Sequence, residues 1–249
     1  MSDSLNKVTI ITGAGGGIGK ATKELLRSKG AIVYNLDIVA GENELPQYFI
    51  ECDVRKREAI KAAIDKVYEK EKRIDWLFAN AGVHLFANIE ETGDEEFDNV
   101  VAINIYGSFY SVKYVLPFMK AARKGSIVLM GSDQTFSGKG QSSVYGLTKG
   151  AIGQLTKSTA IDYAKFNIRV NCVCPGSIDT PLLQRAASRY AYLNRENYED
   201  VMTALHAAQP WGRLGRADEI ARVVEFLLSD ENSFMTGSLV SSDGGYVCQ

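Results

Sequence analysis

The residues best suited to acid–base chemistry in this 249-residue chain are Tyr145 and Lys149, which lie four positions apart. On a helix, that spacing puts both side chains on one face. A tyrosine hydroxyl has a pKa near 10 and is a poor base at neutral pH. A cation about 4 Å away, at an effective dielectric constant near 20, is worth about 4 kcal/mol, or roughly three pKa units. We therefore expect Lys149 to lower the pKa of Tyr145, and Tyr145 to act as a general acid/base.

The spacing alone is weak support, because a chain with twelve tyrosines and many lysines produces such pairs by chance. Tyr68 and Lys72 form one in a stretch of alternating lysine and glutamate, which is typical of a solvated helix face, and we interpret that pair as structural. Tyr145 differs because Ser132 precedes it, at the end of the apolar run Ser126–Gly131. The carboxyl ends of strands border the crevice of open α/β sheets, so the three side chains can converge there. We expect Ser132 to hydrogen-bond the substrate oxygen and to stabilise charge that develops on it.

A glycine-rich segment, Gly13-Ala14-Gly15-Gly16-Gly17-Ile18-Gly19, joins the first apolar run to the first helical pattern. Glycine lets the backbone turn sharply and approach a pyrophosphate, whose charge then meets free N–H groups and the positive end of the helix dipole. A glycine run by itself can simply form a turn and bind nothing. Between a first strand and a first helix, however, it predicts a dinucleotide site that includes Gly13, Gly17, Ile18 and Gly19.

Asp37 ends the second apolar run, roughly 20 residues beyond the glycine turn, where an acid can accept hydrogen bonds from the adenosine ribose. The same carboxylate would repel a 2′-phosphate, and neither Gly16 nor Ile38 offers a compensating positive charge. The expected cofactor is NAD. An exposed aspartate that merely ends a strand is the alternative interpretation of this residue alone.

Short apolar runs rich in valine and isoleucine alternate with longer helical patterns. Runs that are apolar on both faces are typical of parallel strands covered by helices, and their alternation indicates right-handed βαβ units. We predict an α/β fold with a doubly wound, Rossmann-like parallel sheet of about seven strands and helices on both faces. With no linker, repeat or low-complexity run, residues 1–249 should form one dinucleotide-binding catalytic domain.

The predicted strands are Val8–Thr12, Ala31–Asp37, Tyr48–Asp53, Trp76–Ala79, Ser126–Gly131, Ile168–Cys174 and Leu239–Ser242. The predicted helices are Ile18–Lys29, Lys56–Lys72, Glu95–Ala122, Tyr145–Phe166, Leu183–Ala208 and Asp218–Leu228. Thr92 has capping-box spacing before the third helix and is its expected N-cap.

Composition narrows the class of protein. Lysine and arginine number 28 against 30 aspartates and glutamates, a net charge of −2, which favours neither a nucleic-acid nor a membrane-surface partner. The start of the chain has no signal-like segment and no run is long enough to span a membrane, so we expect a cytoplasmic protein. We expect its four cysteines to be reduced thiols and, with two histidines, no metal site.

These motifs resemble, in order and spacing, those of the short-chain dehydrogenase/reductase family in its single-domain form. The resemblance covers essentially the whole chain. It rests on Thr12-Gly13, Gly17-Ile18-Gly19, Asp53, Asn80-Ala81-Gly82, Asn104, Ser132, Tyr145, Lys149 and Pro175-Gly176. It implies an oxidoreductase that interconverts a secondary alcohol and a ketone by hydride transfer to or from NAD.

The resemblance also implies roles for individual residues. Asp53 and Val54 would hold the adenine edge, and Asn80, Ala81 and Gly82 would line the cofactor, although a strand-ending turn explains this triplet without one. Asn104 would hold a water that passes protons from Lys149 towards solvent; its alternative is a helix asparagine bonded to nearby backbone. Lys149 would also contact the nicotinamide ribose together with Tyr145. Its charge, with that of the oxidised nicotinamide, would bring the pKa of Tyr145 close to the operating pH. The residues expected to bracket the nicotinamide are Pro175, Gly176, Ile178 and Thr180.

The substrate is less well specified. Asp133 departs from the family pattern, in which small residues usually follow the serine; it should either point away from Tyr145 or contact a polar substrate. Residues 177–213 should cover the substrate, a small polyol, sugar or hydroxy acid. The candidate substrate residues are Ser132, Gln134, Gln141, Tyr145 and Ser177, with His84 nearby. An NADPH-dependent carbonyl or oxo-acyl reductase and a non-catalytic dinucleotide sensor stay open as alternatives.

We also expect a homotetramer. The patterns Glu95–Ala122 and Tyr145–Phe166 are apolar around most of their circumference, and small residues on the second allow close approach of a neighbouring backbone. Two such helices from each of two subunits could pack as an isologous interface. The resemblance suggests a second contact through the last helix and the strand near Leu239.

Overall fold

A seven-stranded, fully parallel sheet forms the centre of the computed structural model, which describes residues 4–249. Residues 1–3 of the expected domain lie outside the described part. The strand order is β3-β2-β1-β4-β5-β6-β9, so the direction of winding reverses between β1 and β4. The strands are β1 (Val8–Thr12), β2 (Ile32–Asp37), β3 (Phe49–Glu51), β4 (Trp76–Ala79), β5 (Gly125–Met130), β6 (Ile168–Pro175) and β9 (Leu239–Ser242). The predicted doubly wound sheet is confirmed, with strand ends within two residues of those expected.

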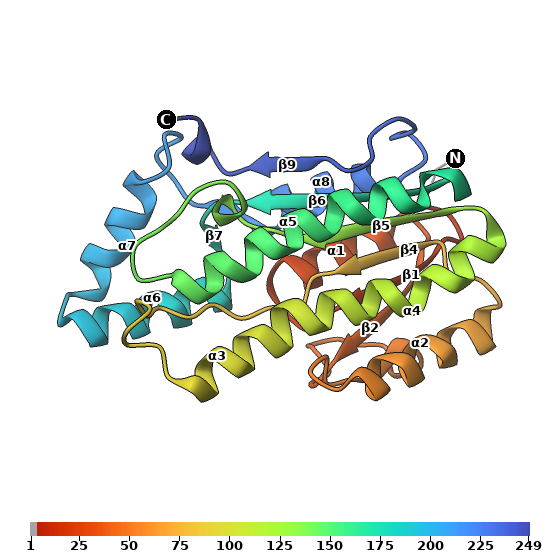
Figure 1. Ribbon diagram of the computed structural model, residues 1–249, viewed down its shortest axis with the longest axis horizontal. Helices are drawn as coiled ribbons and strands as arrows, with labels where there is room; N and C mark the ends of the chain where they lie inside the picture. The colour runs from red at the N-terminus through yellow and green to blue at the C-terminus, as the bar shows by residue number, and fades with distance from the viewer. Residues whose placement is uncertain (1–3) are drawn as a thin grey trace.

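Helices cover both faces of the sheet, which is why β1 and β4 are buried at every position. On one face lie α1 (Gly17–Ser28) and α8 (Ala217–Leu228), which pack against each other. On the other lie α2 (Arg57–Glu71), α4 (Gly107–Ala122) and α5 (Ser143–Tyr163), nearest the viewer in Figure 1. Each layer encloses its own apolar core, one centred on residues such as Ile10, Leu77 and Ile127 and the other on residues such as Ile11 and Phe78.

The third predicted helix, Glu95–Ala122, is interrupted. It begins as α3 (Asp94–Val101), passes through a π-helical turn at Ala102–Tyr106 and continues as α4. Thr92 was expected to be its N-cap, but Gly93 occupies that position. The Thr92 hydroxyl donates to the Asn88 carbonyl oxygen instead. The start of a helix here is set by three acidic residues in its first turn rather than by a side-chain cap.

The segment 177–213, hereafter the cover segment, differs most from expectation. The single helix predicted at Leu183–Ala208 is two helices, α6 (Pro181–Asn194) and α7 (Tyr198–Ala207). Arg195 adopts a left-handed φ of 55° that ends α6, and the Asn197 side chain caps α7. The two helices share a small apolar cluster separate from the main cores and lie beyond the tips of the strand arrows in Figure 1.

A second, two-stranded parallel sheet joins the two ends of the cover segment. It pairs β7 (Ile178–Asp179) with β8 (Gly215–Arg216). Strands of two residues carry no periodicity, so the sequence could not reveal them. Within residues 4–249, no helix is both long and apolar enough to cross a membrane.

Candidate active site

A cavity of about 950 Å³ opens at the carboxyl ends of β1, β2, β4, β5 and β6. This is the edge at which open α/β sheets bind ligands. Of the cofactor residues expected from the sequence, all except Gly19 line it: Gly13, Gly17, Ile18, Asp37, Asp53, Val54, Asn80, Ala81, Gly82, Tyr145, Lys149, Pro175, Gly176, Ile178 and Thr180. The structure therefore brings residues from the whole length of the chain to one hollow.

The glycine turn is shaped by close packing as well as by backbone freedom. Gly13 has a φ of 70°, and a Cβ there would lie 2.9 Å from the Cα of Ala81. Gly19 does not reach the cavity; a Cβ on it would lie 2.3 Å from the Gly13 carbonyl oxygen. The N-terminus of α1 has neither a side-chain cap nor an acidic residue in its first turn. Its first N–H groups are thus free for an anion.

Side chains from β2 and β4 hold this turn in place. The Asn80 amide donates to the carbonyl oxygens of Thr12 and Gly13, at 3.0 and 2.9 Å. From the other side, Asn35 accepts a hydrogen bond from the Ala14 N–H at 3.0 Å and donates to Glu44. The Asn80-Ala81-Gly82 triplet thus has a structural role that needs no cofactor, as well as a place in the cavity wall.

Glu44 is a buried carboxylate that sequence reasoning missed. Its side chain is 3% exposed and pairs with both Lys23 and Arg27. Burial raises its pKa, but hydrogen bonds from Lys23, Asn35 and Arg27 outweigh this and leave the pKa below its ordinary value. No local motif marks this cluster, because its members are assembled from α1, β2 and the loop that follows β2.

The acidic residues expected to face adenosine differ in how they are engaged. Asp37 accepts hydrogen bonds from the N–H groups of Gly15 and Ile38, at 2.9 and 2.8 Å. The carboxylate of Asp53 instead binds the Arg55 guanidinium through both oxygens, and this hydrogen-bonded pair lowers the pKa of Asp53. Arg55, a further cavity residue, was not anticipated from the sequence.

Ser132, Tyr145 and Lys149 converge at the opposite end of the cavity. Ser132 follows β5, whereas Tyr145 and Lys149 lie one turn apart on α5, as predicted. Lys149 is 3% exposed; its Nζ donates to the Met130 carbonyl oxygen at 2.8 Å and lies 5.3 Å from the centroid of the Tyr145 ring. The imidazole of His84 packs against the same ring, with centroids 4.3 Å apart.

Without a bound nucleotide, Lys149 does not lower the pKa of Tyr145, and the expected combined effect of Lys149 and oxidised nicotinamide stays a prediction. Removal of the phenol from water raises its pKa, a hydrogen bond with Ser132 opposes this, and the charges of Asp133 and Cys174 raise it further. Burial also disfavours the charged form of Lys149 and lowers its pKa to about 8. Its ammonium is directed at a backbone carbonyl, and the sequence could not show that desolvation outweighs the attraction.

Asn104 lies in the π-helical turn and is fully buried. Its Nδ2 donates to the Val83 carbonyl oxygen and to Thr148 Oγ1, at 3.0 and 3.1 Å, and its Oδ1 accepts from the Val83 N–H at 2.9 Å. The side chain therefore clamps the backbone beside Gly82, which is the alternative given above. The water-holding role implied by the resemblance stays a prediction.

Asp133 does not point away from the site. Its carboxylate is 3% exposed, accepts the Ser132 hydroxyl at 2.8 Å and pairs with Lys139 Nζ at 2.7 Å. Lys139 lines the cavity and was missed from the sequence. The signal that could have revealed it is the need of a buried carboxylate for a cation nearby in the chain.

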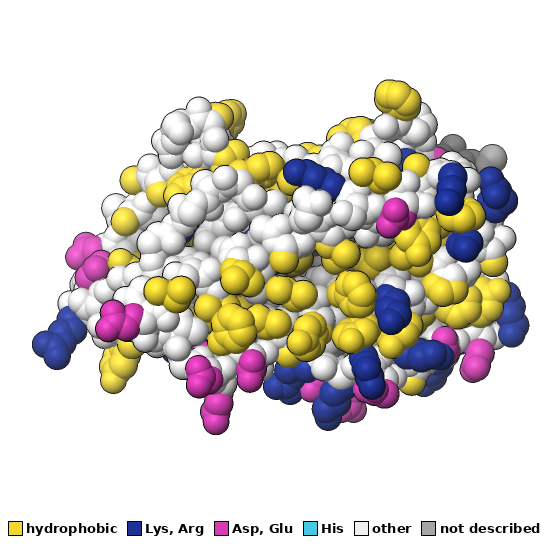
Figure 2. Space-filling model, viewed as in Figure 1, with side chains coloured by type: hydrophobic (Ala, Val, Ile, Leu, Met, Phe, Trp, Pro, Cys, Tyr) yellow, Lys and Arg dark blue, Asp and Glu magenta, His cyan; other side chains and the backbone are white. Residues whose placement is uncertain are grey.

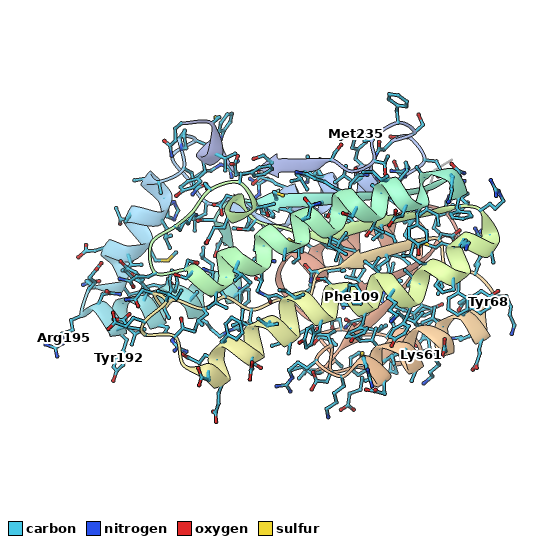
Figure 3. The ribbon with its side chains drawn as sticks, viewed as in Figure 1. Lys61, Tyr68, Phe109, Tyr192, Arg195 and Met235 are labelled. Atoms are coloured by element: carbon cyan, nitrogen blue, oxygen red, sulfur yellow. The ribbon has the colours of Figure 1, made fainter. Side chains whose placement is uncertain are left out.

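Four of the five candidate substrate residues line the cavity and one does not. Ser132, Gln134, Tyr145 and Ser177 line the cavity. Gln141 does not; it exchanges hydrogen bonds with Asn194 of α6 and so joins the loop before α5 to the cover segment. The expected structural role of Tyr68 is confirmed, because its ring stacks on Phe118, 4.0 Å between centroids, and lies outside the cavity lining (Figure 3).

Two further features of the described residues concern cysteines and metals. Cys172 and Cys174 approach to 3.6 Å between sulfur atoms, beneath the catalytic end of the cavity, but all four cysteines are free. Residues 4–249 contain no group of three or more histidine, cysteine, aspartate or glutamate side chains able to hold a metal ion.

Comparison with known proteins identifies the family. A family model described as enoyl-(acyl carrier protein) reductase matches residues 13–247. The 3-oxoacyl-[acyl-carrier-protein] reductase FabG of Thermotoga maritima is 38% identical over 253 residues, 97% of this chain and 98% of that protein. The chain belongs to the short-chain dehydrogenase/reductase family. As a member it is an oxidoreductase that binds a nicotinamide dinucleotide.

Solved structures of the short-chain dehydrogenase/reductase family match the whole fold. Aldohexose dehydrogenase of Thermoplasma acidophilum is similar with a TM-score of 0.92 at 36% identity, covering 100% of this chain and 96% of that one. The structure of ElxO with NADP bound gives a TM-score of 0.88 at 30% identity, covering 98% and 100% of the two chains. The names of these relatives include two different substrates and one cofactor, NADP, so the family alone leaves the substrate and the choice between NAD and NADP open here.

The burial of His84 generates a prediction about stability. Burial, followed by the charges of Lys139 and Lys149, lowers its pKa from 6.5 to about 4. Between these values the unfolded chain binds the proton and the folded protein does not, so stability falls as the pH drops through this window. Between pH 7 and pH 5, the unfolding free energy of His84→Gln should therefore fall by about 2 kcal/mol less than that of the wild type.

Urea denaturation at the two pH values measures this difference. His206→Gln is the matched control, because His206 is exposed on α7. An equal loss in the His84→Gln variant and the wild type would contradict a buried, neutral imidazole.

Proposed function

We propose that this protein is an NAD-dependent alcohol dehydrogenase/reductase in which Tyr145 transfers the proton while hydride passes between a secondary alcohol carbon and the nicotinamide. The observation that carries the proposal is the convergence of Ser132, Tyr145 and Lys149 at one end of a cavity whose other end holds the glycine turn and Asp37. We further infer one catalytic domain, with residues 177–213 covering the substrate.

The residues present fit a dinucleotide. The uncapped N-terminus of α1 and the tight glycine turn can take a pyrophosphate, and Asp37 is placed to accept the ribose hydroxyls. Gly16 leaves open space, since a Cβ there would meet nothing within 4 Å. When bound, an oxidised nicotinamide supplies the hydride acceptor and a positive charge.

The chain's own residues then handle the proton. With its pKa raised, Tyr145 holds its proton at neutral pH and can donate it to a ketone oxygen; in the oxidative direction it must lose that proton first. Burial lowers the pKa of Lys149 to about 8, so at neutral pH its side chain is mostly the ammonium, which favours the phenolate. Asn104 holds the Val83 backbone beside this pair.

NAD is favoured over NADP by the charges of the cavity. Among the described residues that line it, the basic ones are Arg55, Lys139, Lys149 and Arg185. Arg55 is bound by Asp53, Lys139 and Lys149 lie at the end that holds Tyr145, and Arg185 lies on α6. Residues 38–41, which follow Asp37, carry no charge. No free cation of the described lining therefore stands ready for a 2′-phosphate beside Asp37.

An NADPH-dependent reductase is the second candidate, because ElxO has been solved with NADP and FabG is a 3-oxoacyl reductase. A polyol or sugar is the substrate class that we favour, in keeping with the polar side chains Gln134, Ser177 and His84 in the lining and with the similarity to an aldohexose dehydrogenase. A panel of secondary alcohols and ketones, followed by NADH absorbance, tests the class directly.

The cofactor assignment predicts at least tenfold higher kcat/KM with NAD than with NADP. Asp37→Ala should narrow this preference mainly by raising the KM for NAD, because ribose contacts contribute binding more than transition-state stabilisation. Steady-state kinetics with both nucleotides measures it, with Asp98→Ala, an exposed residue of α3, as control. Equal efficiency of the two nucleotides in the wild type would exclude the assignment.

The catalytic assignment predicts that Tyr145→Phe lowers turnover by about 10²-fold or more while NADH binding, followed by fluorescence, stays nearly intact. Lys149→Ala should weaken both, because its ammonium also faces the nucleotide. Tyr68→Phe is the matched control and should change neither. Retention of more than about a tenth of wild-type activity by Tyr145→Phe would refute the role.

We also propose a homotetramer. The outer faces of α4 and α5 expose apolar side chains, among them Phe109, Leu147 and Ile161, and Gly150 leaves open space for an approaching backbone. Figure 2 shows the apolar surface over these helices, and Phe109 stands on it in Figure 3. On the last helix, Phe226 is also 42% exposed, in line with a second contact.

Light scattering at micromolar concentration should give a mass near four times 27.3 kDa. Leu147→Glu, which places a charge on the outer face of α5, should lower that mass, because a buried unpaired charge is costly. A stable and active monomer in the wild type would overturn the proposal.

A further inference from the structure

The Asp133–Lys139 ion pair is the part of the catalytic end that the proposed proton transfer does not use. Asp133 is almost completely buried, and its two recorded partners are the Ser132 hydroxyl at 2.8 Å and Lys139 Nζ at 2.7 Å. Lys139 in turn lies 4.0 Å from the centroid of the Tyr246 ring, so the C-terminal segment helps to hold it. Both members of the pair line the cavity.

This pair changes what Ser132 can do. A serine hydroxyl has one proton and two lone pairs. The proton goes to Asp133 and one lone pair accepts the Gln134 N–H at 3.2 Å. The same hydroxyl also lies within hydrogen-bond reach of Tyr145. With its proton on Asp133, Ser132 therefore has no donor to offer the reacting oxygen. It becomes a donor there only when another group takes its place on the Asp133 carboxylate.

The polar groups around the pair are also mostly acceptors. Gln134 is 7% exposed, and its Oε1 has no hydrogen-bond partner. His84 Nδ1 is likewise buried and unpartnered, while its Nε2 lies 3.4 Å from Ser142 Oγ. Because a low pKa keeps this imidazole neutral, one of its nitrogens accepts. A ligand with several hydroxyl donors satisfies this set.

We infer that Asp133 and Lys139 bind the hydroxyl on the carbon next to the reacting one, and hence that the substrate is a vicinal diol, or an α-hydroxyketone in the reductive direction. This inference rests on the proposed function. A hydroxyl both donates and accepts, so it can give its proton to Asp133 and receive one from Lys139.

Binding of that hydroxyl couples recognition to chemistry. When it takes over as the donor to Asp133, the Ser132 proton is free for the alkoxide that develops as hydride leaves. Other substituents fail for separate reasons. An ether oxygen only accepts, a carboxylate is repelled by Asp133, and a methylene group leaves the buried carboxylate without a new partner.

Three six-membered-ring probes separate these properties: 1,2-cyclohexanediol as cis and trans isomers, 2-methoxycyclohexanol and cyclohexanol. The better diol isomer should have a kcat/KM at least about 10²-fold above both other probes, since a site built to bond a hydroxyl rejects analogues that lack the donor. In Asp133→Asn this ratio should fall at least tenfold, because the amide carries no charge to attract the proton. Asp98→Asn, an exposed change, is the matched control.

Binding without turnover gives an independent readout. Calorimetric titration of the probes into Tyr145→Phe with NAD should show tighter binding of the diol than of the methoxy analogue, and Asp133→Asn in that background should remove the difference. NADH fluorescence titration and thermal melting verify that the variants are folded.

The outcomes separate the two proposals. Absence of turnover for all probes and for the wider alcohol panel would defeat the proposed function, whatever the affinities. The diol inference would be overturned by similar kcat/KM for all three probes, or by similar affinities of the diol and the methoxy compound. It would also be overturned if no probe bound detectably, or if the preference for the diol survived in Asp133→Asn. A purely structural Asp133 would lower activity on all probes equally and leave the ratio in place.

Discussion

The carboxamide of Asn80 joins the ends of the two strands between which the cavity opens. It bonds the backbone after β1 from its position after β4, and Thr12 Oγ1 accepts the N–H groups of Asn80 and Ala81 in return. The winding of the sheet reverses between these strands, so a crevice opens at this edge. The glycine turn on one side and the Gly82–Val83 backbone on the other therefore keep a fixed spacing, on which the cavity depends.

At both ends of the cavity, a buried carboxylate is paired with lysine or arginine side chains of the protein itself, without a ligand. Glu44 is neutralised by two cations beside Asn35, and Asp133 by Lys139 beside Ser132. Lys149 differs from these two carboxylates, because its buried ammonium has a backbone carbonyl as its hydrogen-bond acceptor. An unpaired cation held out of water raises the local potential, which is the condition under which a phenol gives up its proton.

The sequence predicted the sheet and most of the cavity wall because each depends on local pattern: apolar runs for the strands, glycines for the turn and the four-residue spacing of Tyr145 and Lys149. It did not predict the π-helical turn around Asn104, because the periodicity continues across it. It also missed Glu44 and Lys139, whose partners are set by tertiary contacts. It did not predict that the Tyr145 pKa is raised when no nucleotide is bound, because pairwise attraction can be estimated from spacing, whereas desolvation depends on the whole fold.

The separate apolar cluster of α6 and α7 has a consequence for protein engineering. Its buried members, Ala187, Ala191 and Val201, contact one another and not the two cores that enclose the sheet. Residues 181–207 can thus be exchanged between relatives as a unit, with Pro181 and the paired strands β7 and β8 marking where the joints belong. Libraries confined to this unit would redesign the roof of the cavity while the sheet, the glycine turn and the tyrosine stay untouched.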